Sequence, residues 1–230
     1  SEPGAVTVPN PDLKPEYAYN VDLGAAVVVG NFIKLDVTGY YTLLNNAMVR
    51  RDFLFNGEET IIFQDELSRV QAIQNAANAY VFGFQFGAEF KLPEGFTFST
   101  DLNFQKGEEE TDDGIKGPSR HAPPFFGFSR LTYQGEKISL QLYTQFQGEQ
   151  SFKNLAIEER SKDEIYAKDS NGNNYSPAWY TLNIKALYPL TDKLTLTTGL
   201  ENITDQRYRP YSSGISGAGR NFIMALRAQF

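Results

Sequence analysis

The stretch ISLQLYTQFQ, from Ile138 to Gln147, alternates between mainly apolar and mainly polar side chains at every step. One set comprises Ile138, Leu140, Leu142, Thr144 and Phe146, and the other comprises Ser139, Gln141, Tyr143, Gln145 and Gln147. Successive side chains of a β-strand point to opposite faces of the sheet. The stretch therefore predicts a strand with one apolar face and one polar face.

The same two-residue period recurs along most of the chain and predicts an all-β fold. It marks nine strands, at 16–29, 31–44, 79–91, 95–107, 124–134, 137–148, 178–190, 193–203 and 219–230. Most of them exceed the ~5–6 residues usual in soluble proteins and reach the ~9–11 residues that cross a bilayer at a tilt.

The connections between these strands alternate between tight turns and long polar loops. Turns with Gly, Pro or Asp are expected at 30–31, 92–95, 135–137 and 191–193, and long loops at 45–78, 108–123, 149–177 and 204–218. Outer-membrane barrels have this pattern, with turns in the periplasm and loops outside. Aromatic residues near predicted strand ends fit an interfacial girdle: Tyr17, Tyr19, Trp179, Tyr180 and Tyr188.

A soluble β-sandwich also alternates, because each of its sheets buries one face. Strand length, the rhythm of short and long connections, and the aromatic C-terminal residue Phe230 favour an antiparallel transmembrane β-barrel instead. The mean hydropathy of −0.40 fits this interpretation, since a barrel strand is apolar only at every second residue.

Composition excludes several classes of function. The 230 residues include no cysteine and one histidine, His121, which rules out disulfide scaffolds, thiol chemistry and multi-histidine metal sites. The net charge of −7 argues against nucleic acid as a partner. No catalytic constellation and no glycine-rich phosphate loop is found. We therefore expect a non-enzymatic protein with no cofactor and no metal centre.

The predicted strands do not close a barrel by themselves. Nine strands place the first and the last in the same direction, and an antiparallel barrel cannot close on such a pair. The opening residues, Ser1 to Gly4, lack the features of a signal peptide. We expect residues 1–230 to form the C-terminal portion of a larger barrel that begins in an extracellular loop, with the missing strands supplied elsewhere.

Three motifs carry a family resemblance. Asn10–Glu16 (NPDLKPE) and Asn20–Gly24 (NVDLG) resemble the N-P-x-L-K-P-E-x-x-x-N-x-E-x-G stretch of TonB-dependent outer-membrane receptors, with Asp22 in place of the usual Glu. The C-terminal motif of the family is similar to a second set of residues, with Ala218 where Pro is common: Glu201–Asp205 (ENITD), the following YRPY and GRNF, and the terminal Phe230. RHAPP at 120–124 resembles the family's R-x-x-P-P motif before a strand.

The resemblance implies the last nine or so strands of a barrel of about 22 in the bacterial outer membrane, surrounded by lipid. It implies an active-import receptor whose cargo is an iron chelate (siderophore) or haem, coupled to the TonB complex through a plug. The plug domain, the TonB box and the N-terminal strands are not in this chain. Polar-face residues would line the lumen or contact the plug: Asp101, Asn103, Gln141 and Gln145. The last strand, with Phe222 and Phe230, would be the signal for the barrel-assembly machinery.

Two alternatives stay open. One is a TonB-dependent receptor for an oligosaccharide or peptide, with a surface lipoprotein as its lid. The other is a passive outer-membrane pore without energy coupling.

The loop that follows the eighth predicted strand holds the candidate ligand contacts. Arg207, Tyr208, Arg209 and Tyr211 would clamp an anionic, ring-bearing chelate by charge and stacking. The competing interpretation is a basic and aromatic rim at the membrane interface. Asn202 and Asp205 are expected to bond to their own backbone, and Gly219 to let the loop turn back.

Two further features invite ligand hypotheses. Asn10–Leu13 resembles the N-P-N-L box of haem receptors, but Asp12 replaces Asn and His121 follows the box instead of preceding it, which favours a rim histidine over a haem ligand. The acidic runs 108–113 and 158–159 contain carboxylates that suit calcium, although solvated loop faces are the more common outcome.

Overall fold

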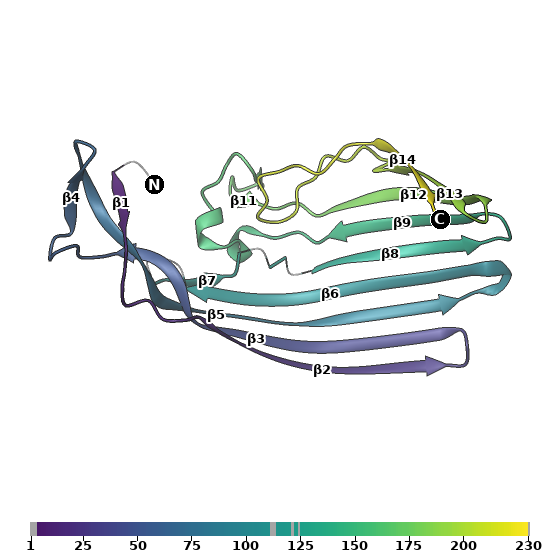
Figure 1. Cartoon of the computed structure of the whole chain (residues 1–230), viewed down its shortest axis with the longest axis horizontal. Helices are drawn as coiled ribbons and strands as arrows, with labels where there is room; N and C mark the ends of the chain where they lie inside the picture. The colour runs from purple at the N-terminus through teal and green to yellow at the C-terminus, as the bar shows by residue number, and fades with distance from the viewer. Residues whose placement is uncertain (1–3, 111–113, 121, 124, 230) are drawn as a thin grey trace. The chain divides into compact units, whose positions relative to one another are not determined.

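A computed structural model of the chain describes residues 4–110, 114–120, 122–123 and 125–229 (Figure 1). Its main sheet runs in the order β14-β13-β12-β9-β8-β6-β5-β3-β2. These strands are β2 (Tyr17–Val29), β3 (Ile33–Asp52), β5 (Glu66–Lys91), β6 (Phe96–Glu110), β8 (Phe125–Gln134), β9 (Ser139–Gln147), β12 (Trp179–Thr191), β13 (Leu194–Glu201) and β14 (Asn221–Ala228). They match the nine predicted strands one for one, which confirms the all-β prediction.

The predicted loop 45–78 is wrong in its extent. β3 continues to Asp52, β5 already begins at Glu66, and the short strand β4 (Thr60–Phe63) lies between them. These extensions carry polar residues on both faces, so their sequence shows no clear alternation. Backbone hydrogen bonds to neighbouring strands keep these segments extended, although no apolar face identifies them as strands in the sequence.

The chain divides into two compact units, and the smaller comprises Ser1–Val21, Tyr41–Phe82 and Gly107–Ser119. In this unit β1 (Ala5–Val8) pairs in parallel with β5, and β4 pairs with β5 in antiparallel. β7 (Lys116–Pro118) pairs with β6. A small apolar core joins β1 to β5 and consists of Val6, Val8, Val70 and Ala72, with Phe53 and Ile61 packed against it.

The larger unit comprises Asp22–Tyr40, Gly83–Lys106 and Arg120–Phe230. Its tight turns, at 30–32, 92–95, 135–138 and 192–193, gather at one end of the sheet, which we name the turn end (Figure 1). The long connections 148–178 and 202–220 lie at the opposite end, the loop end (Figure 1). The predicted alternation of turns and loops is therefore confirmed in this unit.

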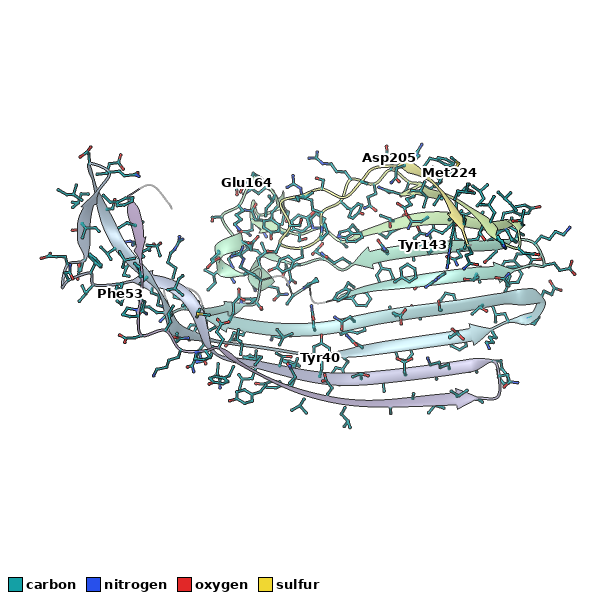
Figure 2. All side chains as sticks on the ribbon, in the orientation of Figure 1. Tyr40, Phe53, Tyr143, Glu164, Asp205 and Met224 are labelled. Carbon is teal, nitrogen blue, oxygen red and sulfur yellow. The ribbon has the colours of Figure 1, made fainter. Side chains whose placement is uncertain are left out.

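Register assigns the side chains of the larger unit to two faces. Directly paired residues share a face, so Leu142 lies with Leu131 and Ile184, whereas Gln145 lies with Phe128 and Thr181. We name the first the apolar face and the second the polar face. By register, Tyr143 belongs to the polar face and Met224 of β14 to the apolar face. Both residues are labelled in Figure 2.

Burial on these faces is inverted relative to a soluble protein. Large apolar side chains stand exposed on the apolar face, including Phe84 (60%), Ile184 (43%), Phe222 (66%) and Met224 (70%). Polar side chains are buried on the polar face, among them Asn103, Gln147, Thr181 and Asn183. A sheet with this distribution needs an apolar medium outside and a polar interior.

The sheet is open. Within the described residues, β2 pairs only with β3 and β14 only with β13, so both edges of the main path are free. This agrees with the prediction that the nine strands form part of a larger barrel and do not close one.

The loop end contains short elements of its own. Loop 148–178 holds the 3-10 turns η2 (Phe152–Asn154) and η3 (Ile157–Glu159) and the small hairpin β10 (Ala167–Lys168) to β11 (Asn174–Tyr175). The helical elements of the described ranges are single turns, and none has the length or hydropathy to cross a membrane.

Candidate functional site

Asn202 holds both ends of loop 204–218 together. Its side chain is buried, and its amide Nδ2 donates to the carbonyls of Gln206 (2.9 Å) and Ala218 (3.0 Å), while Oδ1 accepts from the Gln206 N–H (3.0 Å). The backbone N–H of Asn202 donates to Asn183 Oδ1 of β12 at 2.8 Å. Its φ of 47° is one that Asn tolerates better than most residues. The predicted bonding of this residue to its own backbone is confirmed.

Asp205, expected to bond to its own backbone, anchors the return of the loop instead. Its Oδ1 accepts the backbone N–H of Arg220 at 2.8 Å. Gly219, expected to let the loop turn back, does so without a positive φ. A Cβ there would lie 3.0 Å from Asp205 Oδ1, so the close approach of that carboxylate leaves little room for a side chain.

A buried carboxylate organises loop 148–178. Glu159 is 1% exposed and accepts from Lys162 Nζ (2.6 Å) and Tyr166 Oη (2.7 Å), and it pairs with Arg120 Nε (3.3 Å). We name these four residues the Glu159 cluster. Burial by itself would raise the pKa of Glu159, but the bonds from Lys162 and Tyr166 and the charges of Lys162 and Arg120 hold it below its ordinary value. Burial and the neighbouring carboxylate raise the pKa of Tyr166.

Tyr211 ties the two long loops to the sheet. It is 4% exposed, its Oη accepts the backbone N–H of Ala156 (3.0 Å), and its own N–H donates to Gln147 Oε1 (3.1 Å). The sequence predicts Tyr211 as a ligand contact, and this stays a prediction. In the structure its buried ring positions loop 204–218 against loop 148–178.

Arg207, Tyr208 and Arg209 come together at a cavity of about 390 Å³, which we name the loop cavity. Tyr208 packs on Trp179 with ring centroids 4.3 Å apart. Arg209 is held by Ser216 Oγ and by the carbonyl of Glu164 (3.1 and 3.0 Å), and Arg207 is exposed. In Figure 2, the label Glu164 lies on loop 148–178 and the label Asp205 on loop 204–218. The cavity offers two guanidinium groups and a tilted aromatic pair, and ligand binding by these residues stays a prediction.

A second cavity, of about 580 Å³, opens on the polar face, and we name it the polar-face cavity. Of the predicted lumen residues, Asp101, Asn103 and Gln145 line it and Gln141 does not. Trp179 also lines it, which corrects its assignment to the outer aromatic girdle. Pairing with Gln147 places Trp179 on the polar face, whereas Tyr180, one residue later, lies on the apolar face and is 54% exposed.

The acidic runs are engaged by cations and hydroxyls where the structure describes them. Glu110 pairs with Arg51 at 2.8 Å, Glu109 accepts from Ser119 Oγ, and Glu158 pairs with Arg120 at 2.8 Å. The described part of the chain contains no cluster of three or more Asp, Glu or His side chains suited to a metal. Asp112, Asp113 and His121 lie outside the described residues, and so does Phe230 of the predicted assembly signal.

Comparison with known proteins places the sheet in a family. A family model described as TonB dependent receptor-like, beta-barrel matches residues 1–203. No curated protein sequence matches the chain.

Several solved structures share the fold. The siderophore receptor PirA from Acinetobacter baumannii aligns with a TM-score of 0.73 and 15% identity over 98% of this chain and 33% of that chain. A mutant of the ferric enterobactin receptor PfeA from Pseudomonas aeruginosa aligns with a TM-score of 0.71 and 18% identity over 97% of this chain and 32% of that chain. The FrpB iron transporter from Neisseria meningitidis aligns with a TM-score of 0.70 and 15% identity over 98% of this chain and 33% of that chain. The chain thus spans about a third of each of these proteins.

Proposed function

Because the chain belongs to the TonB-dependent receptor family, as part of the β-barrel, we propose that it is the C-terminal barrel portion of an active-import receptor of the bacterial outer membrane. The inverted burial of the larger unit carries this proposal. Its apolar face exposes Phe84, Ile184 and Met224, which suits contact with lipid, and its polar face buries amides, which suits a wet interior.

The proposal assigns the turn end to the periplasm and the loop end to the outside. The remaining strands and a plug would come from other parts of the receptor, and the TonB complex would act through that plug. Transport without enzymatic chemistry is the activity we assign. No step in this function calls for a cofactor.

We assign the cargo to the metal chelates, with an iron-siderophore complex or haem as its form. The loop cavity supports this assignment, because Arg207 and Arg209 supply positive charge next to the Trp179–Tyr208 ring pair. Charge-assisted bonds and stacking are the interactions that an anionic aromatic chelate offers. PirA, PfeA and FrpB, which share the fold, are named for siderophore or iron transport.

Binding of a ferric catecholate chelate to the full-length receptor in detergent tests this proposal. Arg207→Gln is expected to weaken binding about fivefold, since an exposed charge contributes up to about 1 kcal/mol. Lys193→Gln, which removes another exposed cation at the turn end, is the matched control and should leave affinity unchanged. Absence of chelate binding, or equal losses in the two variants, would contradict the cargo assignment.

We also propose that the last strand is recognised by the barrel-assembly machinery through Phe222, with Phe230. Phe222 is 66% exposed on the free edge strand β14. Phe222→Ser should lower the amount of assembled receptor in the outer membrane more than Met224→Ser, which removes a similarly exposed side chain of the same face.

A further inference from the structure

A cavity of about 240 Å³ opens on the apolar face of the larger unit, and we name it the apolar-face cavity. Its apolar lining comes from four neighbouring strands and consists of Phe96, Leu131, Tyr133, Leu140, Leu142 and Ile184. Register places Leu131, Leu142 and Ile184 in one cross-strand row, and Tyr133 with Leu140 in a row two residues nearer to the turn end. The cavity therefore lies on the face suited to lipid, toward the turn end.

The turn between β8 and β9 lies next to the cavity. One pair of residues separates the Tyr133–Leu140 pair from this turn. The Tyr133 side chain reaches the turn itself, since a Cβ at Gly135 would lie 3.3 Å from Tyr133 Oη. The tip of the turn carries Glu136 and Lys137, which are consecutive in the sequence. Within a few residues the apolar lining thus gives way to a phenol hydroxyl and two opposite charges.

The charges at the tip of this turn are free to meet a ligand. Glu136 and Lys137 are exposed, and neither forms an ion pair within the described part of the chain. The neighbouring turn, which joins β5 to β6, adds Lys91 and Glu94, both exposed. Equal numbers of carboxylate and ammonium groups suit a ligand that carries both signs of charge and disfavour one that is only anionic.

The apolar lining suits a lipid acyl chain, but it does not select one lipid. Lipid tails are as apolar as leucine, so a chain in the cavity gains only closer packing, and contacts to the headgroup must decide which lipid stays. At ~3.4 Å per residue, the strand from Lys137 to Leu142 spans about 17 Å. The headgroup region of a leaflet is only ~5–8 Å deep. A lipid whose headgroup lies at the turn therefore has its acyl chains at the depth of the cavity.

We propose that the apolar-face cavity and the β8–β9 turn form a binding site for one zwitterionic phospholipid with a primary ammonium group, the chemistry of phosphatidylethanolamine. Lys137 binds the phosphate, Glu136 accepts N–H bonds from the ammonium group, and an acyl chain packs on Leu142 and Ile184. This inference rests on the proposed function, which places the turn end in the phospholipid leaflet that faces the periplasm. A choline headgroup has no N–H to donate, and a glycerol headgroup has no cation for Glu136.

Native mass spectrometry on the delipidated full-length receptor in detergent tests the site. The probes are phosphatidylethanolamine, phosphatidylcholine and phosphatidylglycerol with identical acyl chains. The first phosphatidylethanolamine bound should be held about fivefold more tightly than either of the others. Glu136→Gln should abolish the preference over phosphatidylcholine, and Lys137→Gln should weaken binding of all three lipids. Leu142 is 43% exposed, so Leu142→Trp fills the cavity without entering a packed core, and it should weaken phosphatidylethanolamine binding.

The β12–β13 turn provides matched charge controls. It carries the same pair of charges, Asp192 and Lys193, and none of its residues lines the cavity. Asp192→Asn and Lys193→Gln should therefore keep the wild-type preference. Leu196→Trp is the control for Leu142→Trp, because pairing with Tyr188 places Leu196 on the apolar face outside the lining.

The proposal is overturned if phosphatidylcholine or phosphatidylglycerol is held as tightly as phosphatidylethanolamine, or if the controls lose the preference as the site variants do. It is also overturned if a second copy of the receptor occupies the cavity, seen as a dimer that Leu142→Trp dissociates. Chelate binding on the same samples separates this result from the proposed cargo. A receptor that binds chelate without a preferred phospholipid refutes only the lipid site, and one that prefers phosphatidylethanolamine without binding chelate refutes only the cargo.

Discussion

Replacing Glu159 by Gln removes the one negative charge at the centre of the Glu159 cluster and leaves the shape of the side chain unchanged. Lys162 and Arg120 then lose their shared anion, while Tyr166 keeps an oxygen to donate to. We expect loop 148–178 to open more often, with the strands of the sheet unaffected.

The size of the effect follows from the burial of the cluster. Breaking a buried ion pair costs about 3–5 kcal/mol. Here the carboxylate is 1% exposed but the Lys162 and Arg120 side chains are 34% and 36% exposed, so water resolvates both cations when the charge is lost. Solvent screening lowers the expected cost to about 2 kcal/mol, which is roughly a 30-fold change in the opening equilibrium.

Hydrogen exchange with mass spectrometry on the full-length receptor measures this opening. The reporters are the N–H of Ala156, bonded to Tyr211 Oη, and the N–H of Glu159, bonded to the carbonyl of Ala156 at 2.9 Å. Glu158→Gln is the matched control. Glu158 pairs with the same Arg120, but its side chain is 42% exposed, so its loss should change protection by less than about fivefold.

The pH dependence has a definite sign. Because the folded loop lowers the pKa of Glu159, the cluster stabilises the loop fully above the ordinary glutamate pKa of about 4.3, and this stability is lost as pH falls through the lower, folded-state value. In the wild type, the protection of the Ala156 and Glu159 N–H groups, corrected for intrinsic exchange, should fall only below a pH of about 4.3. Glu159→Gln should not show this fall. Equal effects of Glu159→Gln and Glu158→Gln, or an acid transition that persists in Glu159→Gln, would refute the reasoning.

Two further substitutions test how the sheet is held. Asn202→Ala removes three hydrogen bonds of a buried side chain and should lower stability to urea in detergent by about 2–4 kcal/mol, whereas Asn171→Ala on the exposed loop should have little effect. Gly83→Ala brings a Cβ against the backbone oxygen of Phe104 and to 2.6 Å from Tyr40 Oη, whose single hydrogen is shared between Asn103 and Gln105 of β6, and should cost about 1–3 kcal/mol in the same assay. Gly214→Ala, with nothing within 4 Å of its added Cβ, is the neutral reference for the second variant.

The sequence predicts the strands well because each one must separate lipid-suited from water-suited side chains at every second residue. The same rule could have placed Trp179 correctly, since it is in phase with Thr181 and Asn183, the polar set of β12. The prediction assigned Trp179 to the outer girdle because it is aromatic, and did not use its position in the alternation of β12. Where both faces of a strand are polar, as in the first part of β5, alternation vanishes and the strand is missed.

The loop end could not be predicted in the same way, because its contacts join residues far apart in the chain. Glu159 and Lys162 are visible as an i, i+3 pair, but Arg120 lies 39 positions before Glu159 and Tyr211 lies 55 positions after Ala156. Burial decides the role of such residues. In the sequence, Tyr211 cannot be told apart from the other predicted ligand contacts, Tyr208 and Arg209. Only the structure shows that its side chain is buried and anchors the loop.

One chain of hydrogen bonds connects the order of the loops to the chemistry of the polar-face cavity. Ala156, three residues before Glu159, holds Tyr211 through its N–H, and the N–H of Tyr211 fixes the amide of Gln147. If the loop opens, that amide loses the donor that fixes it and becomes free to turn. Glu159→Gln should therefore raise the exchange rate of the Tyr211 N–H as well as that of the Ala156 N–H, although Glu159 does not line the cavity. Exchange that rises about 30-fold at the Ala156 N–H and stays unchanged at the Tyr211 N–H would show that the two are independent.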